Sequence, residues 1–223
     1  MVERDFDKAW ETLSALTDVR DRITGYEFEL SEDNSRAKFN DFIQAVTFSD
    51  TIVIYTRGST KKDYLILLVV VSELFHKALC SCVPLRIGIA HGIFYFNLTK
   101  SMYAGPALIE AYRIGEACQW LGITLANSLE LPEHNIKFAK HGETLFTEWN
   151  VPYKEGASKH RVINWPFAFK DDLKVVPPVT VSQFYEAFEP IFGDFETLDL
   201  SSQQKYINTV EFMNSKLIGE HNA

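Results

Sequence analysis

The residues best suited to chemistry are an aspartate and a few cations at the ends of predicted elements. Asp50 lies at the apex of a predicted hairpin, where a carboxylate can ligate a divalent ion or accept hydrogen bonds from backbone amides. Arg113 lies on a predicted helix, where its planar guanidinium can grip phosphate oxygens or pair with Glu110 or Glu116 at helical spacing. Because the net charge is −8, a polyphosphate substrate would have to be met by a local cluster of cations or by a metal ion.

The elements that position these residues are indicated by apolar periodicity and by glycine and proline. Helical spacing predicts helices over residues 6–24, 62–82, 105–121, 181–192 and 201–218. Alternating or β-rich runs predict a hairpin over 39–55 and strands over 85–90, 93–96, 123–126 and 159–165, with a turn or short helix at 128–132. We therefore expect an α+β protein, with a main domain over 1–170 and a helical extension over 171–223 packed on that domain.

Composition and charge exclude several classes of protein. With 46% hydrophobic and 23% charged residues, the chain has the composition of a globular protein. The acidic balance argues against a broad nucleic-acid-binding surface. The longest apolar run, 65–72, is far shorter than the roughly twenty residues of a membrane helix, so we expect no membrane span and a cytoplasmic location. The three cysteines lack CxxC spacing and predict reduced thiols without a disulfide framework or zinc site.

Three sequence blocks, in this order and spacing, carry a family resemblance: FSDTIVIY at 48–55, PLRIGIAHGIFYF at 84–96 and YAGPALIEAYRIGEACQWLGITL at 103–125. Together they resemble the catalytic domain of class III nucleotidyl cyclases over residues 39–165. The GPA at 105–107 and the NWP at 164–166 point more narrowly to the bacterial pyrimidine cyclases of Pycsar antiphage defence. The resemblance implies a ferredoxin-like class III cyclase fold with an antiparallel-rich sheet, followed here by a C-terminal helical tail.

The resemblance also implies roles for single residues. Asp50 would bind a divalent metal, Mn²⁺ or Mg²⁺, and Arg113 would be the catalytic arginine that neutralises charge at the reacting phosphate. Lys154 would meet the terminal phosphates, with Lys159 as the neighbouring alternative. Arg86 would be either a buried structural arginine or a contact to the substrate.

The base-reading residues of purine cyclases are absent from this chain. Val46 and Met102 occupy the places of the lysine and aspartate that read adenine, and with Phe42 and Tyr103 they would form an apolar pocket for a smaller base. The resemblance thus implies an enzyme that converts UTP, or alternatively CTP, to the 3′,5′-cyclic monophosphate and pyrophosphate as an antiviral second messenger. A head-to-tail homodimer would supply Asp50 from one subunit and Arg113 from the other.

Two features depart from the family pattern. Ile109 stands one helical turn before Arg113, where purine cyclases carry an asparagine that orients the ribose. The first metal-binding FxDxxG-like strand is not found ahead of the hairpin, and Asp41 imitates it only locally. A truncated domain or a catalytically degenerate module that binds nucleotide or dimerises would explain this, and a ferredoxin-like protein without a nucleotide site is a third alternative.

Overall fold

A computed structural model of the protein describes residues 2–25, 27–29, 36–48, 50–129, 144–168 and 176–218. The chain forms two compact units, Met1–Val83 and Pro84–Ala223, and each has its own helices and strands. The mixture of helices and largely antiparallel strands confirms the α+β class. Among the described helices, none combines the length and the apolar character needed to cross a membrane.

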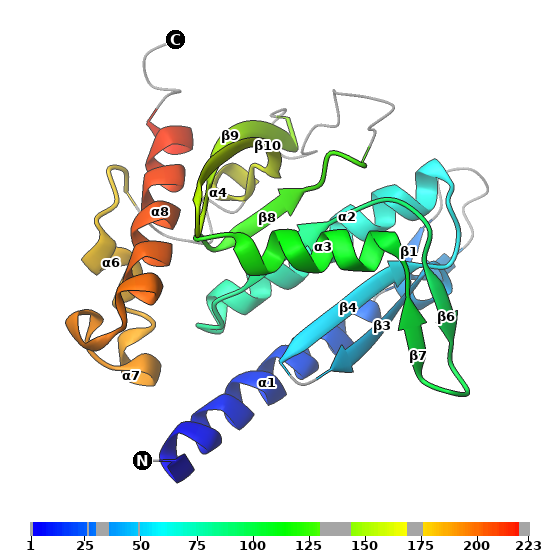
Figure 1. Ribbon diagram of the computed structural model, residues 1–223, viewed down its shortest axis with the longest axis horizontal. Coiled ribbons are helices and arrows are strands. Elements are labelled where there is room, and N and C mark those ends of the chain that lie inside the picture. The colour runs from blue at the N-terminus through cyan, green and yellow to red at the C-terminus, as the bar shows by residue number, and fades with distance from the viewer. Residues whose placement is uncertain are drawn as a thin grey trace. The chain divides into compact units, whose positions relative to one another are not determined.

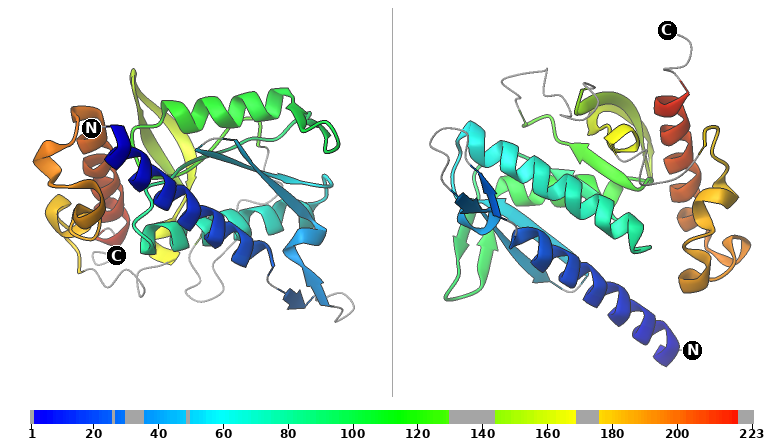
Figure 2. Two further views of the ribbon diagram at one scale, coloured as in Figure 1. Left: turned by 90° about the horizontal axis from the view of Figure 1, so that it is seen from below. Right: turned by 180° about the vertical axis from the view of Figure 1, so that it is seen from behind.

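The first unit combines two long helices with two hairpins (Figure 1). In chain order its elements are α1 Val2–Thr24, β1 Glu27–Glu29, β2 Arg36–Lys38, η1 Phe39–Asp41, β3 Ile43–Phe48, β4 Thr51–Thr56 and α2 Lys61–Cys80. Helices α1 and α2 lie side by side, as the two views of Figure 2 also show. The hydroxyl of Thr60 accepts a hydrogen bond from the Asp63 amide and caps the start of α2.

The hairpin predicted from sequence is confirmed by strands β3 and β4. Ile43 pairs with Thr56 at the open end and Phe48 pairs with Thr51 at the closed end, so Asp50 lies in the turn. The hairpin was predicted to begin at residue 39, but its first strand begins at Ile43 because Phe39–Asp41 forms a short 3₁₀ helix. In that helix the carboxylate of Asp41 accepts a hydrogen bond of 2.8 Å from the Lys38 amide.

The second unit is built on a four-stranded sheet. Its elements are β5 Arg86–Ile89, β6 Tyr95–Asn97, β7 Met102–Ala104, α3 Pro106–Ala117, β8 Gly122–Leu125, β9 Phe146–Tyr153, β10 Gly156–Ile163, α4 Trp165–Ala168, α6 Val181–Tyr185, α7 Glu189–Phe192, η2 Phe195–Thr197 and α8 Leu200–Leu217. The sheet order is β5-β8-β10-β9, in which β5 and β8 are parallel and the other pairs antiparallel. Strands β6 and β7 form a separate hairpin.

The core of the second unit is aromatic and joins the sheet to the C-terminal helix. Phe212 of α8 is fully buried, and its ring lies 4.7 Å from that of Trp120, 5.3 Å from Trp149 and 6.1 Å from Trp165, measured between centroids. Burying an aromatic cluster of this size stabilises the fold through both area and edge-to-face geometry. Helix α8 therefore belongs to the same compact unit as the sheet.

Two predicted helices differ in length from those observed. The helix predicted to reach residue 121 ends at Ala117, because Cys118 adopts an extended conformation and forms a β-bridge with Tyr153. The helix predicted over 181–192 is divided into α6 and α7. Pro190 lacks an amide hydrogen and its ring would collide with the preceding helical turn, so a continuous helix is disfavoured there. A turn is observed at Asn127–Ser128, whereas most of the turn or short helix predicted over 128–132 lies outside the described residues.

Candidate functional site

Helix α3 is positioned by an unusually close approach to strand β5. A Cβ atom on Gly88 would collide with the carbonyl oxygen of Ala111, so only glycine allows the helix to lie this close to the strand. Gly115 faces the same contact, and the space beside it would accept a methyl group. At its start, Gly105 has a φ of +152° and is followed by Pro106 in the first helical turn.

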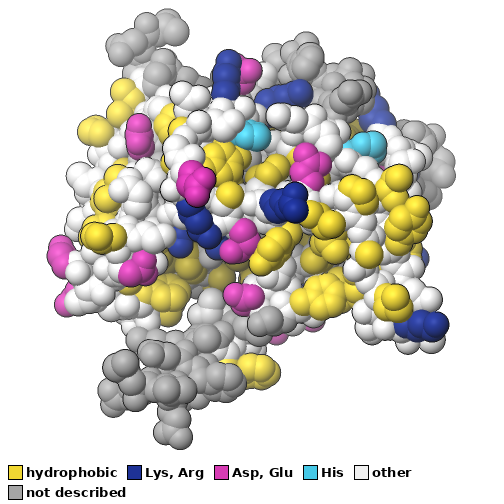
Figure 3. Space-filling model, in the orientation of Figure 1, with side chains coloured by type: hydrophobic (Ala, Val, Ile, Leu, Met, Phe, Trp, Pro, Cys, Tyr) yellow, Lys and Arg dark blue, Asp and Glu magenta, His cyan; other side chains and the backbone are white. Residues whose placement is uncertain are grey.

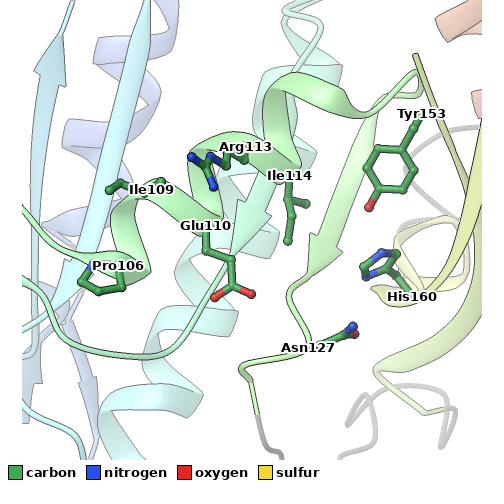
Figure 4. Close-up of a pocket in the computed structure, with 8 residues that line it drawn as sticks. All are labelled: Pro106, Ile109, Glu110, Arg113, Ile114, Asn127, Tyr153 and His160. Carbon is green, nitrogen blue, oxygen red and sulfur yellow. The ribbon is translucent and has the colours of Figure 1, made fainter. Parts of the chain in front are cut away.

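A pocket of about 600 Å³ lies beside α3 within the second unit. Its lining comes from one face of α3, the segment after β8 and the β9–β10 hairpin, and consists of Pro106, Ile109, Glu110, Arg113, Ile114, Asn127, Tyr153 and His160 (Figure 4). This volume is within the range of small-molecule sites in proteins. Lys and Arg side chains, carboxylates and hydrophobic groups lie close together on the molecular face that carries α3 (Figure 3).

Arg113 carries a charge that the described part of the protein does not neutralise. Its side chain is exposed, and it forms no hydrogen bond or ion pair with a described residue. Figure 4 shows the guanidinium of Arg113 and the carboxylate of Glu110 directed away from each other. Glu116, the other predicted partner, pairs instead with Arg86 at 3.1 Å. The guanidinium of Arg113 is therefore available to an anionic ligand.

The opposite wall of the pocket offers hydrogen-bonding groups from Tyr153, His160 and Asn127. Burial, and next the neighbouring Cys118, raise the pKa of the Tyr153 phenol, so this group remains protonated at neutral pH. The Nδ1 atom of His160 lies 3.2 Å from the carbonyl oxygen of Leu125. Since a carbonyl oxygen can only accept, Nδ1 carries a hydrogen and donates it to Leu125. The amide of Asn127 points toward His160 (Figure 4).

The two candidate lysines differ in their surroundings. Lys159 forms a 2.5 Å ion pair with Glu148 across the β9–β10 ladder, and this contact holds the pKa of the Glu148 carboxyl below its usual value. Lys154 is exposed, and its ammonium group has no partner among the residues the structure describes. Its amide donates a 3.1 Å hydrogen bond to the carbonyl of Ala117, which places Lys154 at the end of α3. Of the two lysines, Lys154 is therefore the one whose ammonium group is available to an anionic ligand.

Arg86 has a structural task at the end of α3. Its guanidinium donates hydrogen bonds to the Glu116 carbonyl at 3.0 Å and the Cys118 carbonyl at 3.3 Å, and it also pairs with the Glu116 carboxylate. A cation in this position stabilises the helix end because the last carbonyls carry partial negative charge. Of its two predicted roles, the structural one is supported by these contacts.

The other predicted site residues are distributed over both units. In the first unit, Asp50 is exposed in the hairpin turn, Val46 pairs with Val53, and the ring of Phe42 lies 5.0 Å from the Lys62 ammonium. In the second unit, Met102 of β7 is 60% exposed and Tyr103 stacks on Phe94 at 6.5 Å. None of the four residues expected to surround the base lines the pocket beside α3.

Three polar pocket residues were not singled out by the sequence: Asn127, Tyr153 and His160. Glu110 was named only as a possible ion-pair partner of Arg113. Asn127 had a weak signal, because a polar residue follows the apolar strand at 122–125. Tyr153 and His160 had none, because strand β9 was not predicted and the antiparallel register of β9 and β10 brings both rings to one end of the sheet. Their ring centroids lie 5.7 Å apart.

Within the described ranges, no three His, Cys, Asp or Glu side chains gather in a way that could hold a metal ion. Comparisons of the chain with protein-family models, with curated proteins and with solved structures found no match in any of the three.

Proposed function

We propose that this chain is a pyrimidine nucleotide cyclase, which converts UTP in preference to CTP to the 3′,5′-cyclic monophosphate and pyrophosphate. The proposed role is antiviral second-messenger signalling in the cytoplasm. The observation that supports this proposal most directly is the exposed guanidinium of Arg113, which has no partner among the described residues and borders a pocket of about 600 Å³. The motif blocks that resemble class III cyclases place the same arginine on the corresponding helix.

The reaction is an intramolecular phosphoryl transfer. The ribose 3′-oxygen forms a bond to the α-phosphorus, the bond from that phosphorus to the bridging oxygen of the β-phosphate breaks, and the hydroxyl proton is lost to solvent. Negative charge increases on the oxygens around the α-phosphorus as pyrophosphate leaves. Arg113 would stabilise this charge through hydrogen bonds from its planar guanidinium, and Tyr153 would donate as a neutral phenol.

Asp50 would hold the divalent ion that the reaction requires. An exposed carboxylate in a hairpin turn suits Mg²⁺ or Mn²⁺, since such ions are often held by one or two carboxylates together with substrate phosphates. When bound, the ion would withdraw charge from the phosphate oxygens and favour ionisation of the attacking hydroxyl. By the resemblance to class III cyclases, the proposed homodimer would combine Asp50 of one subunit with Arg113 of the other.

The proposal of a pyrimidine substrate rests on the absence of the lysine and aspartate that read adenine in purine cyclases. Val46 and Met102 cannot hydrogen-bond to the adenine edge as a lysine and an aspartate do. A uracil or cytosine ring would instead be selected by size and by apolar contact.

The test is an assay of the purified protein with Mn²⁺ or Mg²⁺ and each of the four ribonucleoside triphosphates, with products separated by chromatography and identified by mass spectrometry. We expect cyclic UMP as the main product and less cyclic CMP. The absence of a cyclic product from every triphosphate with either metal would refute the enzymatic proposal.

A second candidate function is a nucleotide-binding module without turnover. Ile109 favours it, because this residue is 51% exposed on the pocket wall and cannot orient a ribose by hydrogen bonding. Calorimetric titration with UTP distinguishes the two candidates: heat of binding without cyclic product supports the module, and product formation excludes it.

A further inference from the structure

Helix α8 docks its N-terminal half against the segment that follows α3. The hydroxyl of Ser201 donates to the side-chain oxygen of Gln119 at 3.0 Å, and the Asn208 amide donates to the Gln119 carbonyl at 2.5 Å. The Thr209 hydroxyl accepts a hydrogen bond of 2.8 Å from the Leu121 amide. One face of α8 is therefore fixed against residues 119–121.

Lys205 lies on this same face. It is one helical turn after Ser201 and one turn before Thr209, so its side chain is directed toward the end of α3. Lys154 reaches the same place from the β9–β10 turn, because its amide is bonded to the Ala117 carbonyl. Two lysines from elements far apart in sequence thus meet at the end of α3.

Among the charged side chains at this place, the cations outnumber the carboxylates. Lys205 is half-buried, and burial, followed by the positive charge of Arg86, lowers the pKa of its ammonium group; Lys154 acts in the same direction. Asp199 and Glu116 act in the opposite direction and partly offset this effect.

Both nearby carboxylates are already engaged. Asp199 caps α8 by accepting hydrogen bonds from the amide and the hydroxyl of Ser202, and Glu116 is paired with Arg86. The ammonium groups of Lys154 and Lys205 donate no hydrogen bond to any residue in the described part of the chain. A partly desolvated ammonium without a partner is costly, and an anion between the two lysines would remove that cost.

We propose that Lys205 is a phosphate-binding residue, which together with Lys154 holds the phosphates of a polyphosphate ligand at the end of α3. Arg113 lies on the same helix, four residues before Ala117 and thus about 6 Å from it along the axis. The assignment of this ligand to the tail of a nucleoside triphosphate rests on the proposed function, whereas polyphosphate binding itself does not.

The first experiment is calorimetric titration of the full chain with inorganic tripolyphosphate. We expect Lys205→Met, which keeps the aliphatic stem but removes the charge, to weaken binding about tenfold. Lys205→Arg should restore most of the affinity, and the control Lys159→Met should bind like the wild type because Lys159 is paired with Glu148. Equal affinity of Lys205→Met and the wild type overturns the proposal.

The second measurement separates binding from structural support. In protein with isotopically labelled lysine, saturating tripolyphosphate should raise the pKa of Lys205 as observed by NMR, because an anion favours the charged ammonium. An unchanged titration of Lys205 overturns the proposal. If the protein forms no cyclic nucleotide but Lys205→Met weakens tripolyphosphate binding and the ligand raises the pKa of Lys205, the phosphate site stands and the cyclase proposal fails. If the protein forms cyclic nucleotide and Lys205→Met changes neither this activity nor tripolyphosphate binding, the cyclase proposal stands and the phosphate site fails.

Discussion

Arg113 and Tyr153 contribute one charged and one neutral hydrogen bond donor to the same pocket. The guanidinium is permanently charged and exposed, whereas the phenol is kept neutral by burial and by Cys118. A permanent charge stabilises a transition state that gains negative charge, and a neutral donor can orient a ligand without adding charge. The two residues should therefore respond differently to substitution.

Arg113→Ala is expected to lower kcat/KM for UTP by about 10²–10³-fold, because it removes a donor aimed at developing charge. Arg113→Lys should recover only part of this loss, since an ammonium cannot make the bidentate contact. Steady-state cyclisation assays measure both, with Arg57→Ala as a control at an exposed arginine of the first unit. A kcat/KM unchanged in Arg113→Ala contradicts the catalytic role.

The raised pKa of the Tyr153 phenol should make the folded protein less stable to unfolding at alkaline pH. Its folded-state pKa is raised above the ordinary value of 10.0, so above that pH the unfolded chain releases a proton that the folded protein retains. The free energy of unfolding should therefore fall as the pH rises through this range. Urea titrations from about pH 9 to about pH 11 should show a smaller decline in Tyr153→Phe than in the wild type. Parallel declines in the two proteins would show that the phenol does not contribute.

At the scale of elements, the position of α3 determines where the pocket lies. The helix is seated on β5 through Gly88, and its end is held by Arg86 and by the amide of Lys154. Helix α8 adds a second support through Gln119 and Leu121. The end of α3 is therefore fixed by three different elements.

The two glycines at the helix–strand contact provide a matched pair of substitutions. Gly88→Ala should lower the free energy of unfolding by about 1–3 kcal/mol and reduce activity, because the new methyl group collides with the Ala111 carbonyl and displaces α3. Gly115→Ala places its methyl group at ordinary contact distance and should be neutral or stabilising by up to about 1 kcal/mol. Urea denaturation measures both, and equal stabilities of the two variants would contradict the close-packing explanation.

At the scale of the molecule, the proposed active site depends on two copies of the chain. Asp50 belongs to the unit Met1–Val83, and Arg113, Lys154 and Lys205 belong to Pro84–Ala223. A head-to-tail dimer with two identical composite sites would use the first unit of one subunit and the second unit of its partner. A variant with a defect in the first unit and a variant with a defect in the second unit should then complement each other when they are mixed.

Mixing two inactive variants tests this arrangement. Asp50→Ala and Arg113→Ala should each retain about 1% of wild-type activity or less. An equimolar mixture after subunit exchange should regain about a quarter of wild-type activity, because half of the dimers carry one intact site out of two. The readout is cyclic nucleotide formation, with sedimentation confirming the dimer. The control is each variant mixed with itself. No recovery in a mixture that does exchange subunits would contradict a composite site.

Local periodicity was sufficient to predict the elements whose pattern is contained within one segment. The predicted helices over 6–24, 62–82 and 201–218 correspond to α1, α2 and α8, and the hairpin with Asp50 at its turn corresponds to β3 and β4. These predictions succeed because helical spacing and tight turns depend on neighbours within a few residues. The position of Arg113 on a helix followed in the same way.

Only the tertiary structure decided which residues meet. The end of α3 at Ala117, the choice of Lys154 over Lys159, the Tyr153–His160 wall and the approach of Lys205 all depend on pairings between segments distant in sequence. Such pairings form when a strand register or a docked helix satisfies backbone and side-chain groups that its own segment cannot satisfy. The amino-acid order thus determined the helices, the hairpin and the types of reactive group, whereas packing between segments decided which cations are paired with a carboxylate and which are available to an anion.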